Sequence, residues 1–117
     1  MGKLTTHVLD TATGKPGAGI RIDLYFVEGE DKELLKSVTT NSDGRCDGPL
    51  LEEDELQVGT YELAFHAGDY FDNQGLELPD PKFLNIVTLP FGISNAEEHY
   101  HVPLLVSPYS YSTYRGS

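Results

Sequence analysis

The chain is short of positive charge, of cysteine and of long apolar runs, and each shortage excludes a class of protein. Eight Lys and Arg residues stand against 19 Asp and Glu, for a formal net charge of −11. Nucleic-acid binding needs a basic stripe that meets the phosphates, and these scattered cations form none. The lone Cys46 excludes an internal disulfide and fits a reducing compartment. No apolar run approaches the roughly 20 residues of a membrane-spanning helix.

The length and the first residues set the organisation that we expect. With 117 residues, the chain is expected to form a single domain over 1–117. Residues 1–7 contain no apolar segment like that of a signal peptide and lead directly into a strand pattern. We therefore expect a cytoplasmic protein. A periplasmic or peroxisomal location would require a targeting segment that this sequence does not contain.

Short segments of alternating apolar and polar residues make up most of the chain. In 20–26 every second residue is apolar, which is the pattern of a half-buried strand. Only Ala67–Gln74, with Gly75 after it, is suited to a short helix. Short strands without long helices predict an all-β, antiparallel sandwich. The predicted strands are 5–9, 20–26, 34–40, 60–66, 84–91, 98–106 and 109–115.

The last eight residues, Ser110 to Ser117, are unusual for a chain end. Termini are commonly frayed, yet here Tyr and Thr residues continue a strand pattern almost to the final carboxylate. The segment also carries a cation, Arg115, and a flexible Gly116. An ordered terminus of this composition is expected to line an interface or a site. The alternative is an edge strand that simply stops.

Two histidines, His99 and His101, share one face of a predicted strand, because side chains repeat every second residue. Such a pair can hold zinc, but a complete catalytic site needs a third ligand, which His7 or His66 would supply only if folding brought it close. Otherwise the pair is a proton-handling histidine beside an exposed neighbour. Pro103 has no N–H, which predicts that this strand lies at a sheet edge or is interrupted there.

His7 and Arg45 are the other candidates for chemistry. His7 lies inside the first predicted strand, where a single histidine is more often a satisfied surface or core residue. Arg45 follows the turn Asn41–Gly44, and turns on a rigid scaffold commonly hold functional side chains. On residue type alone, Arg45 is equally explained as a surface cation.

Four motifs are distributed over the whole chain. They are Thr5-Thr6-His7-Val8-Leu9-Asp10, the turn Asp43-Gly44-Arg45, His101-Val102-Pro103-Leu104-Leu105 with Ser107-Pro108, and the ending Tyr111-Ser112-Thr113-Tyr114-Arg115-Gly116-Ser117. Together they resemble the 5-hydroxyisourate hydrolase family, which shares the transthyretin fold. The ending from Tyr114 to Ser117 is the most specific part of the resemblance, because it closes the hydrolases and is absent from the hormone carriers.

The resemblance implies a transthyretin-like antiparallel β-sandwich of about eight strands in two sheets with one short helix. It also implies a homotetramer, a dimer of dimers, with active sites in the channel between dimers, where the chain ends converge. The implied activity is hydrolysis of 5-hydroxyisourate, a small purine-derived molecule, to 2-oxo-4-hydroxy-4-carboxy-5-ureidoimidazoline in urate degradation. The resemblance implies no cofactor and no metal.

The resemblance assigns catalytic roles to His7, Arg45 and His101. His99 has no role in it. The motif leaves open whether Arg115 contacts substrate or holds the terminus in place. The residues expected to bind substrate are His7, Arg45, Tyr114, Arg115, Gly116 and Ser117.

These residue types suit hydrolysis of a ring amide, which needs a base for water, stabilisation of the carbonyl oxygen and a proton for the departing nitrogen. A histidine with a pKa of about 6.5 exchanges protons at neutral pH, so His7 or His101 can be the base. The Arg45 guanidinium stays charged and can polarise substrate carbonyls. The Ser117 carboxylate can orient a histidine. Tyr114 can stack on a planar ring or donate a hydrogen bond to it.

Two other functions stay open from the sequence. One is a small-ligand binding module like the hormone carriers, since a fold does not determine a function. A carrier should lack the two histidines, Arg45 and the terminal tetrapeptide together, whereas this chain has all of them. The other is a zinc-dependent hydrolase that uses His99 and His101.

Overall fold

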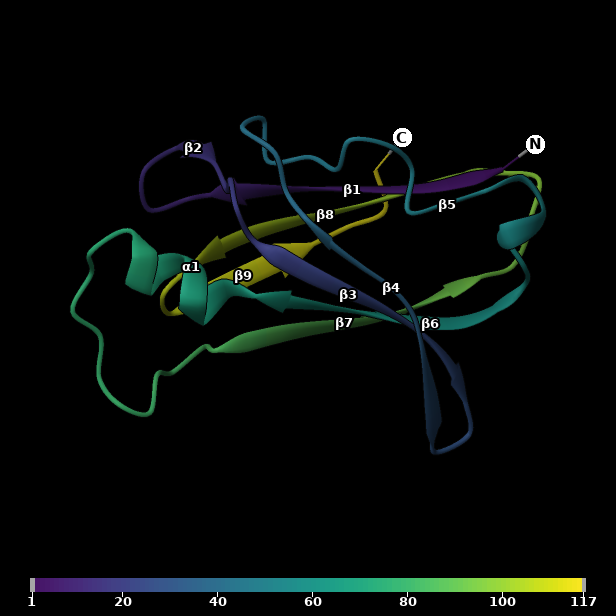
Figure 1. The fold of residues 1–117 in the computed structure, drawn as a ribbon. Coiled ribbons are helices and arrows are strands. Elements are labelled where there is room, and N and C mark those ends of the chain that lie inside the picture. The colour runs from purple at the N-terminus through teal and green to yellow at the C-terminus, as the bar shows by residue number, and fades with distance from the viewer. Residues whose placement is uncertain (1, 117) are drawn as a thin grey trace.

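Two β-sheets packed face to face form the body of the protein in a computed structural model that describes residues 2–116 (Figure 1). The first sheet has the order β2-β1-β8-β9, with β5 also paired to β1, and the second has the order β4-β3-β6-β7. The prediction of an all-β sandwich is confirmed. The strands of the first sheet are β1 (Lys3–Asp10), β2 (Lys15–Pro16), β5 (Leu51–Glu52), β8 (His99–Ser107) and β9 (Ser110–Thr113). Those of the second are β3 (Arg21–Glu28), β4 (Asp31–Thr39), β6 (Gly59–His66) and β7 (Ile86–Ile93).

One strand pair departs from a purely antiparallel arrangement. β1 and β8 run parallel, whereas the other strand pairs described within residues 2–116 are antiparallel. The longer strands lie where the alternation predicts them, although β7 starts at Ile86 rather than at residue 84. The two-residue strands β2 and β5 and the 3-10 turn Glu53–Glu55 were not predicted, because elements this short have no periodic pattern.

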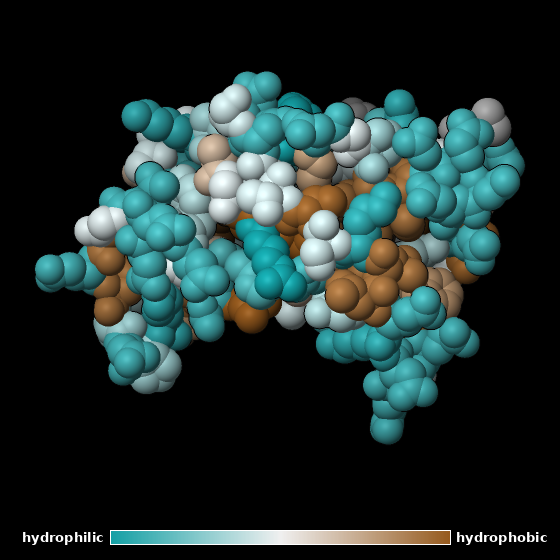
Figure 2. All heavy atoms as spheres, in the orientation of Figure 1, coloured by the Kyte–Doolittle hydropathy of each residue, from teal (hydrophilic) through white to brown (hydrophobic). Residues whose placement is uncertain are grey.

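The core lies between the sheets and consists of alternate residues from their facing surfaces. Strands present successive side chains to opposite faces, so the intervening residues point outward. Figure 2 shows apolar residues in the layer between the sheets, whereas the end of the β3–β4 hairpin that projects from the sandwich is hydrophilic. This packing holds the outward-facing residues of both sheets on a rigid support. Core side chains with almost no exposed surface include Leu4, Val8, Ile22, Leu24, Leu63, Phe65 and Leu104.

Pro103 lies in an inner strand of the first sheet. β8 runs between β1 and β9, and its pairing with β1 continues without a break through the pair His7 and Pro103. The prediction that Pro103 marks a sheet edge is therefore wrong, whereas the predicted interruption occurs on the side that faces β9. The ladder from β8 to β9 ends at the pair Leu104 and Thr113, so no ladder bond is required from the nitrogen of Pro103. The Pro103 carbonyl instead accepts a bond from the Thr113 hydroxyl, at 2.7 Å.

The short helix α1 (Ala67–Asn73) confirms the predicted helix. It ends at Asn73 with Gln74 as its C-cap, and Gly75 follows with a φ of 81°, a left-handed conformation that glycine adopts readily. The Tyr70 hydroxyl joins the helix to the end of β1 by donating to the buried Asp10 carboxylate at 2.8 Å. Burial, and then the bond to Asp10, raise the pKa of Tyr70 to about 12. Neither α1 nor another helix in residues 2–116 has the length and apolar character needed to cross a membrane.

Candidate active site

Four polar side chains gather on the outer face of the pair formed by β1 and β8. The alternation that buries Leu4 and Val8 on β1, and Tyr100 on β8, turns their neighbours outward. The parallel register then places the two outward rows side by side. The four residues are Thr5 and His7 of β1 and His99 and His101 of β8.

His7 and His101 are in direct contact. His7 Nδ1 lies 2.7 Å from His101 Nε2, which is hydrogen-bond distance. The two ring planes are 17° apart, and the ring centroids are separated by 4.8 Å. Both side chains are half-buried, so they remain open to water or substrate on one side. The structure thus brings together two residues that the sequence predicted for the same site.

The surroundings favour the neutral form of both histidines. Burial is the larger cause that lowers the pKa of His7 below its ordinary value, and the charge of Arg45 adds to it. Burial also lowers the pKa of His101, with further contributions from His7, Arg45 and His99. A neutral imidazole offers one donor and one acceptor nitrogen, as a general base requires.

Arg45 reaches this face from a turn that is clamped against β1. The side-chain oxygen of Asn41 accepts the N–H of Asp43 at 2.9 Å and the N–H of Arg45 at 3.2 Å. Gly44 has a φ of 73°, and its carbonyl accepts the N–H of Val8 at 2.8 Å. A Cβ at Gly44 would lie 2.5 Å from the Val8 carbonyl oxygen, so the turn requires glycine there. The backbone of Arg45 consequently pairs with His7, and its exposed side chain starts beside the histidines.

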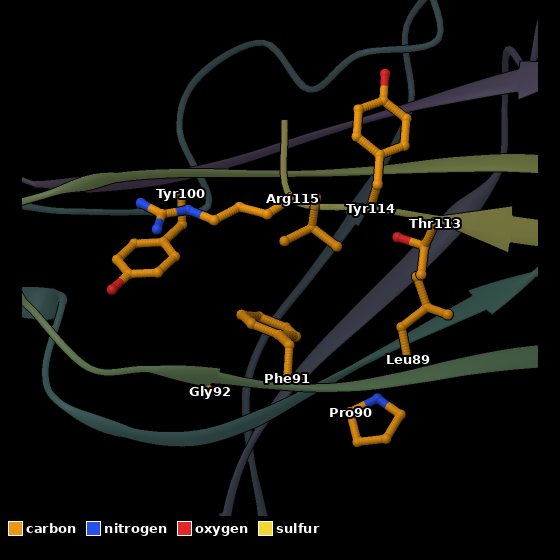
Figure 3. A pocket seen from close by; sticks show the side chains of 9 residues that line it. Leu89, Pro90, Phe91, Gly92, Tyr100, Thr113, Tyr114 and Arg115 are labelled. Carbon is orange, nitrogen blue, oxygen red and sulfur yellow. The ribbon is translucent and has the colours of Figure 1, made fainter. Parts of the chain in front are cut away.

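The C-terminal segment returns to the same face through Gly116. The N–H of Gly116 donates to the His101 carbonyl at 2.7 Å, and the two residues form an antiparallel bridge. A Cβ at Gly116 would lie 2.7 Å from Cδ2 of the His101 ring, so the ring packs directly on the glycine backbone. The exposed Tyr114 side chain points away from Leu89 and Phe91 in Figure 3.

The Arg115 side chain is bound by other residues of the same chain. Its guanidinium forms an ion pair with Glu98 at 3.0 Å and donates to the His99 carbonyl at 3.2 Å. It also lies 4.1 Å from the centre of the Tyr100 ring, which faces the core (Figure 3). Arg115 therefore fixes the terminal segment to β8. Substrate contact by Arg115 stays a prediction, and Ser117 lies outside the described residues.

A cavity of about 220 Å³ lies between β7, β8 and the C-terminal segment (Figure 3). Its lining is mostly apolar and includes Leu89, Phe91 and Tyr100. Tyr114 and Arg115 also line it, but the predicted catalytic residues do not. The two histidines lie on the outer face of the first sheet, so this cavity is separate from them.

Thr5 and His99 belong to the cluster, although the sequence assigned Thr5 no role and considered His99 only as a zinc ligand. Thr5 Oγ1 lies 2.9 Å from His99 Nε2 and 2.7 Å from His101 Nδ1. The signal that could have found them is the spacing of Thr5 and His7 on one strand and of His99 and His101 on another, since each pair shares a face. Only the pairing of β1 with β8 shows that the two faces are continuous.

The arrangement of ligand side chains also bears on the zinc hypothesis. Within residues 2–116, no three His, Cys, Asp or Glu side chains lie together in a group that could hold a metal ion. A zinc site on His99 and His101 would therefore need a ligand from outside this part of the chain.

The class of protein is shown by a match of residues 4–116 to the model of the HIUase/Transthyretin family. The chain belongs to this family, which confirms the resemblance read from its motifs. It is 64% identical over 116 residues to 5-hydroxyisourate hydrolase 2 of Rhizobium meliloti, covering 99% of this chain and 97% of the relative. It is 60% identical over 117 residues to 5-hydroxyisourate hydrolase of Pseudomonas aeruginosa, covering 100% of this chain and 93% of the relative.

Solved structures agree with the family. A crystal structure of (S)-allantoin synthase superposes with a TM-score of 0.94 and 48% identity over 99% of this chain. This chain spans 44% of that protein's chain. Sea bream transthyretin in complex with thyroxine superposes with a TM-score of 0.86, covering 97% of this chain and 94% of the transthyretin. Its identity of 24% shows a shared fold alone.

Proposed function

We propose that this chain is a 5-hydroxyisourate hydrolase, which opens the ring of 5-hydroxyisourate to give 2-oxo-4-hydroxy-4-carboxy-5-ureidoimidazoline in urate degradation. The observation that carries the proposal is the 2.7 Å contact between His7 Nδ1 and His101 Nε2, with Arg45 paired to His7. The substrate follows from family membership and from the 64% identity to a relative of that name.

In this proposal the histidine pair supplies the base. Because burial and Arg45 lower the pKa of His7, the ring is neutral at pH 7 and can accept a proton from water. His101 holds the ring of His7 through Nε2 and can share the proton. Positioned proton transfer of this kind contributes on the order of 10²–10⁴-fold in rate.

Arg45 supplies the fixed positive charge. Attack of water on a ring carbonyl places negative charge on the carbonyl oxygen, and a preorganised guanidinium stabilises that charge. Its planar donors can also hold the carbonyl groups of an oxidised purine. The same charge adds to burial in lowering the pKa of both histidines, so Arg45 favours a neutral base and also stabilises the oxyanion.

The terminal segment completes the proposed site. Gly116 packs on the His101 ring and sets its position. Tyr114 is proposed to stack on the substrate ring. The carboxylate of Ser117 is proposed to orient a histidine. Arg115 holds this segment in place through Glu98, and a direct contact with substrate is a separate prediction.

The test follows the ultraviolet decay of freshly generated 5-hydroxyisourate with and without protein. We expect wild-type protein to accelerate the decay, and His101→Asn or Arg45→Ala to remove on the order of 10²–10⁴-fold of that rate. Arg21→Ala is the matched control, because Arg21 is an exposed arginine on the second sheet. Wild-type rates in both site variants would overturn the assignment of these residues.

We further propose that four chains assemble as a dimer of dimers that covers the outer face of the first sheet. His7 and His101 are half-exposed on that face, so a second chain would enclose the substrate. β7 and β9 end their sheets and offer edges for pairing within each dimer. Light scattering after gel filtration tests the assembly. A monomer with full activity would contradict it.

Two alternatives make different predictions. A carrier of small ligands would bind the purine without accelerating its decay. A zinc-dependent hydrolase built on His99 and His101 would lose activity after treatment with a strong chelator and would contain zinc by elemental analysis. We expect activity that resists chelation.

The remaining proposals concern organisation and location. One domain over residues 1–117 is supported by a single core cluster to which both sheets contribute. Limited proteolysis that released two stable fragments would contradict it. A cytoplasmic location is supported by Cys46, a free and half-buried thiol. Cell fractionation with an antibody against the chain tests it.

A further inference from the structure

Three hydrogen bonds join four side chains into one line across β1 and β8. His7 Nδ1 contacts His101 Nε2 at 2.7 Å, and His101 Nδ1 contacts Thr5 Oγ1 at 2.7 Å. Thr5 Oγ1 then contacts His99 Nε2 at 2.9 Å. The line starts beside Arg45 and ends at His99, whose side chain is exposed. The proposed function uses His7 and His101 and leaves Thr5 and His99 without a role.

Thr5 makes the direction of this line reversible. A threonine hydroxyl has one hydrogen to donate, so Thr5 donates to one of its two histidines and accepts from the other. When Thr5 donates to His101, a neutral His101 carries its hydrogen on Nε2 and donates to His7. When Thr5 donates to His99 instead, His7 donates to His101 and His101 donates to Thr5. The same atoms therefore satisfy every bond in two opposite directions.

We propose that Thr5 and His99 form the outer half of a proton relay that connects His7 with solvent during the reaction. The inference rests on the proposed hydrolysis, which needs a base when water attacks and an acid when the ring nitrogen departs. A reversible line provides both at His7 Nε2, because reversing its direction exchanges an acceptor nitrogen for a donor. Neither Thr5 nor His99 needs to touch substrate.

In the first step, water forms a bond from its oxygen to the ring carbonyl carbon, and one of its O–H bonds breaks. That proton goes to His7 Nε2, and the carbonyl oxygen takes the negative charge beside Arg45. The hydrogen on His7 Nδ1 passes to His101 Nε2, the hydrogen on His101 Nδ1 to Thr5, and the Thr5 hydrogen to His99 Nε2. His99 releases its Nδ1 hydrogen to water, so all three rings are neutral again.

In the second step, the C–N bond breaks with its electron pair on nitrogen, and the nitrogen takes the hydrogen from His7 Nε2. The line then runs back. His101 returns a hydrogen to His7, Thr5 returns one to His101, and His99 returns one to Thr5 while it takes a proton from solvent. The new carboxylic acid loses its proton to water. One proton is released for each ring opened, and the line is restored.

Substitutions at Thr5 test the inner link of the relay. Thr5→Val removes the hydroxyl but keeps the shape, so kcat is expected to fall by up to about 10²-fold with KM unchanged. Thr5→Ser keeps the hydroxyl and is expected to retain most of the wild-type kcat. If Thr5 instead acts through its methyl group, Thr5→Val should keep a higher kcat than Thr5→Ser. That result would overturn the relay.

Substitution of His99 tests the solvent end. His99→Gln is expected to lower kcat in dilute buffer and to recover it as small imidazole buffers are added, because a buffer molecule can replace the missing ring. The kcat of wild-type protein should not depend on the buffer. The kcat of Thr5→Val should not recover, since the missing hydroxyl lies inside the line, where a buffer molecule cannot replace it. Wild-type kcat in both His99→Gln and Thr5→Val overturns the relay, as does a His99→Gln loss that buffer does not relieve.

These outcomes are separate from the proposed function. Activity of wild-type protein, and its loss in His101→Asn, test the hydrolase itself. A readout without substrate is the ¹⁵N spectrum of the His101 ring, which reports how its hydrogen divides between Nδ1 and Nε2. The relay predicts hydrogen on both nitrogens in wild-type protein and a changed division in Thr5→Val. An unchanged division overturns it whether or not the protein hydrolyses 5-hydroxyisourate.

Discussion

Each sheet carries on its outer face one hydrogen-bonded cluster of polar side chains that includes histidine, and the two clusters are built in opposite ways. On the second sheet, His66 Nε2 lies 2.9 Å from Asp23 Oδ2. The other oxygen of Asp23 accepts bonds from Ser37 at 2.7 Å and from Arg21 at 3.1 Å. A carboxylate only accepts, so every partner of Asp23 is fixed as a donor. On the first sheet the described bonds join imidazoles to each other and to a hydroxyl, and their direction is not fixed.

The difference between the clusters shows that one sheet carries polar groups that contribute to stability and the other carries polar groups suited to catalysis. Burial alone would raise the pKa of Asp23, but the bonds from Ser37, His66 and Arg21 outweigh it and lower the pKa. The stability that Asp23 contributes is therefore present above the ordinary aspartate pKa and is lost as the pH falls through the lowered one. At His7 the lowered pKa has the opposite meaning, because it favours a neutral ring that is ready to accept a proton.

The largest expected effect contrasts the two histidine clusters directly. His7→Asn should lower the rate of 5-hydroxyisourate decay by on the order of 10²–10⁴-fold, because it removes a positioned base. His66→Asn should leave the rate close to wild type, since His66 lies on the other sheet with Asp23. Both variants are measured in the same ultraviolet assay. Equal losses in the two would show that the clusters do not differ in function.

A smaller effect is expected at Gly116, which supports the first cluster. In Gly116→Ala the new Cβ would lie 2.7 Å from His101 Cδ2, so the ring must move. A displacement of about 1 Å can cost about 10²-fold in rate. Gly48→Ala is the matched control, because a Cβ there meets nothing within 4 Å. Full activity in Gly116→Ala, measured beside an unchanged Tm, would show that the ring position tolerates the change.

The second cluster is expected to respond in stability rather than in rate. Asp23→Ala leaves Ser37 and His66 without their acceptor and should lower the free energy of unfolding by about 1–3 kcal/mol. Asp72→Asn, which disrupts an exposed ion pair with Lys82, should cost less than about 1 kcal/mol. Urea unfolding measures both changes. A loss of activity in Asp23→Ala without a loss of stability would reverse the roles given to the two clusters.

The smallest effect concerns pH at the first cluster. Burial and Arg45 lower the pKa of His7, so the folded state binds fewer protons there than the unfolded chain as the pH falls below about 6.5. Stability at this site is therefore lost on acidification, and activity that needs a neutral base falls at a pH below the ordinary histidine pKa. Arg45→Ala should raise the pKa of both His7 and His101.

Histidine titration by NMR, followed at the ring Cε1 protons, measures this shift. Arg21→Ala should leave the titration of His7 and His101 unchanged, since Arg21 pairs with Asp23 on the other sheet. If the two histidines titrate alike in wild-type protein and in Arg45→Ala, then Arg45 does not lower their pKa and acts only on substrate.

Much of the fold and the reactive residues could be predicted from the sequence. Alternation located β3 and β6, because a half-buried strand shows its two faces in every pair of neighbours. The same alternation put His99 and His101 on one face. The motifs selected His7 and His101 as site residues, and the structure places them in contact.

Other features could not be predicted because they depend on which strands pair. Pro103 suggested an edge, yet β8 is an inner strand whose bonds to β9 end beside it. Arg115 belonged to the signature, but only the folded terminus shows that its guanidinium lies on Glu98 and Tyr100. Thr5 lay in a motif and His99 in a histidine pair, but only the pairing of β1 with β8 shows that the two side chains are in contact.

The order of residues by itself determined the faces: a period of two assigns each side chain to the core or to the outside before any strand has a neighbour. Only the tertiary structure decided which strands pair with each other. Thr5 and His101 are separated by 96 positions in the chain, and the parallel pairing of β1 with β8 brings them into contact. Backbone N–H and C=O groups can pair with any strand, so local patterns could not specify that meeting. The meeting is what turns four separate polar residues into one hydrogen-bonded line.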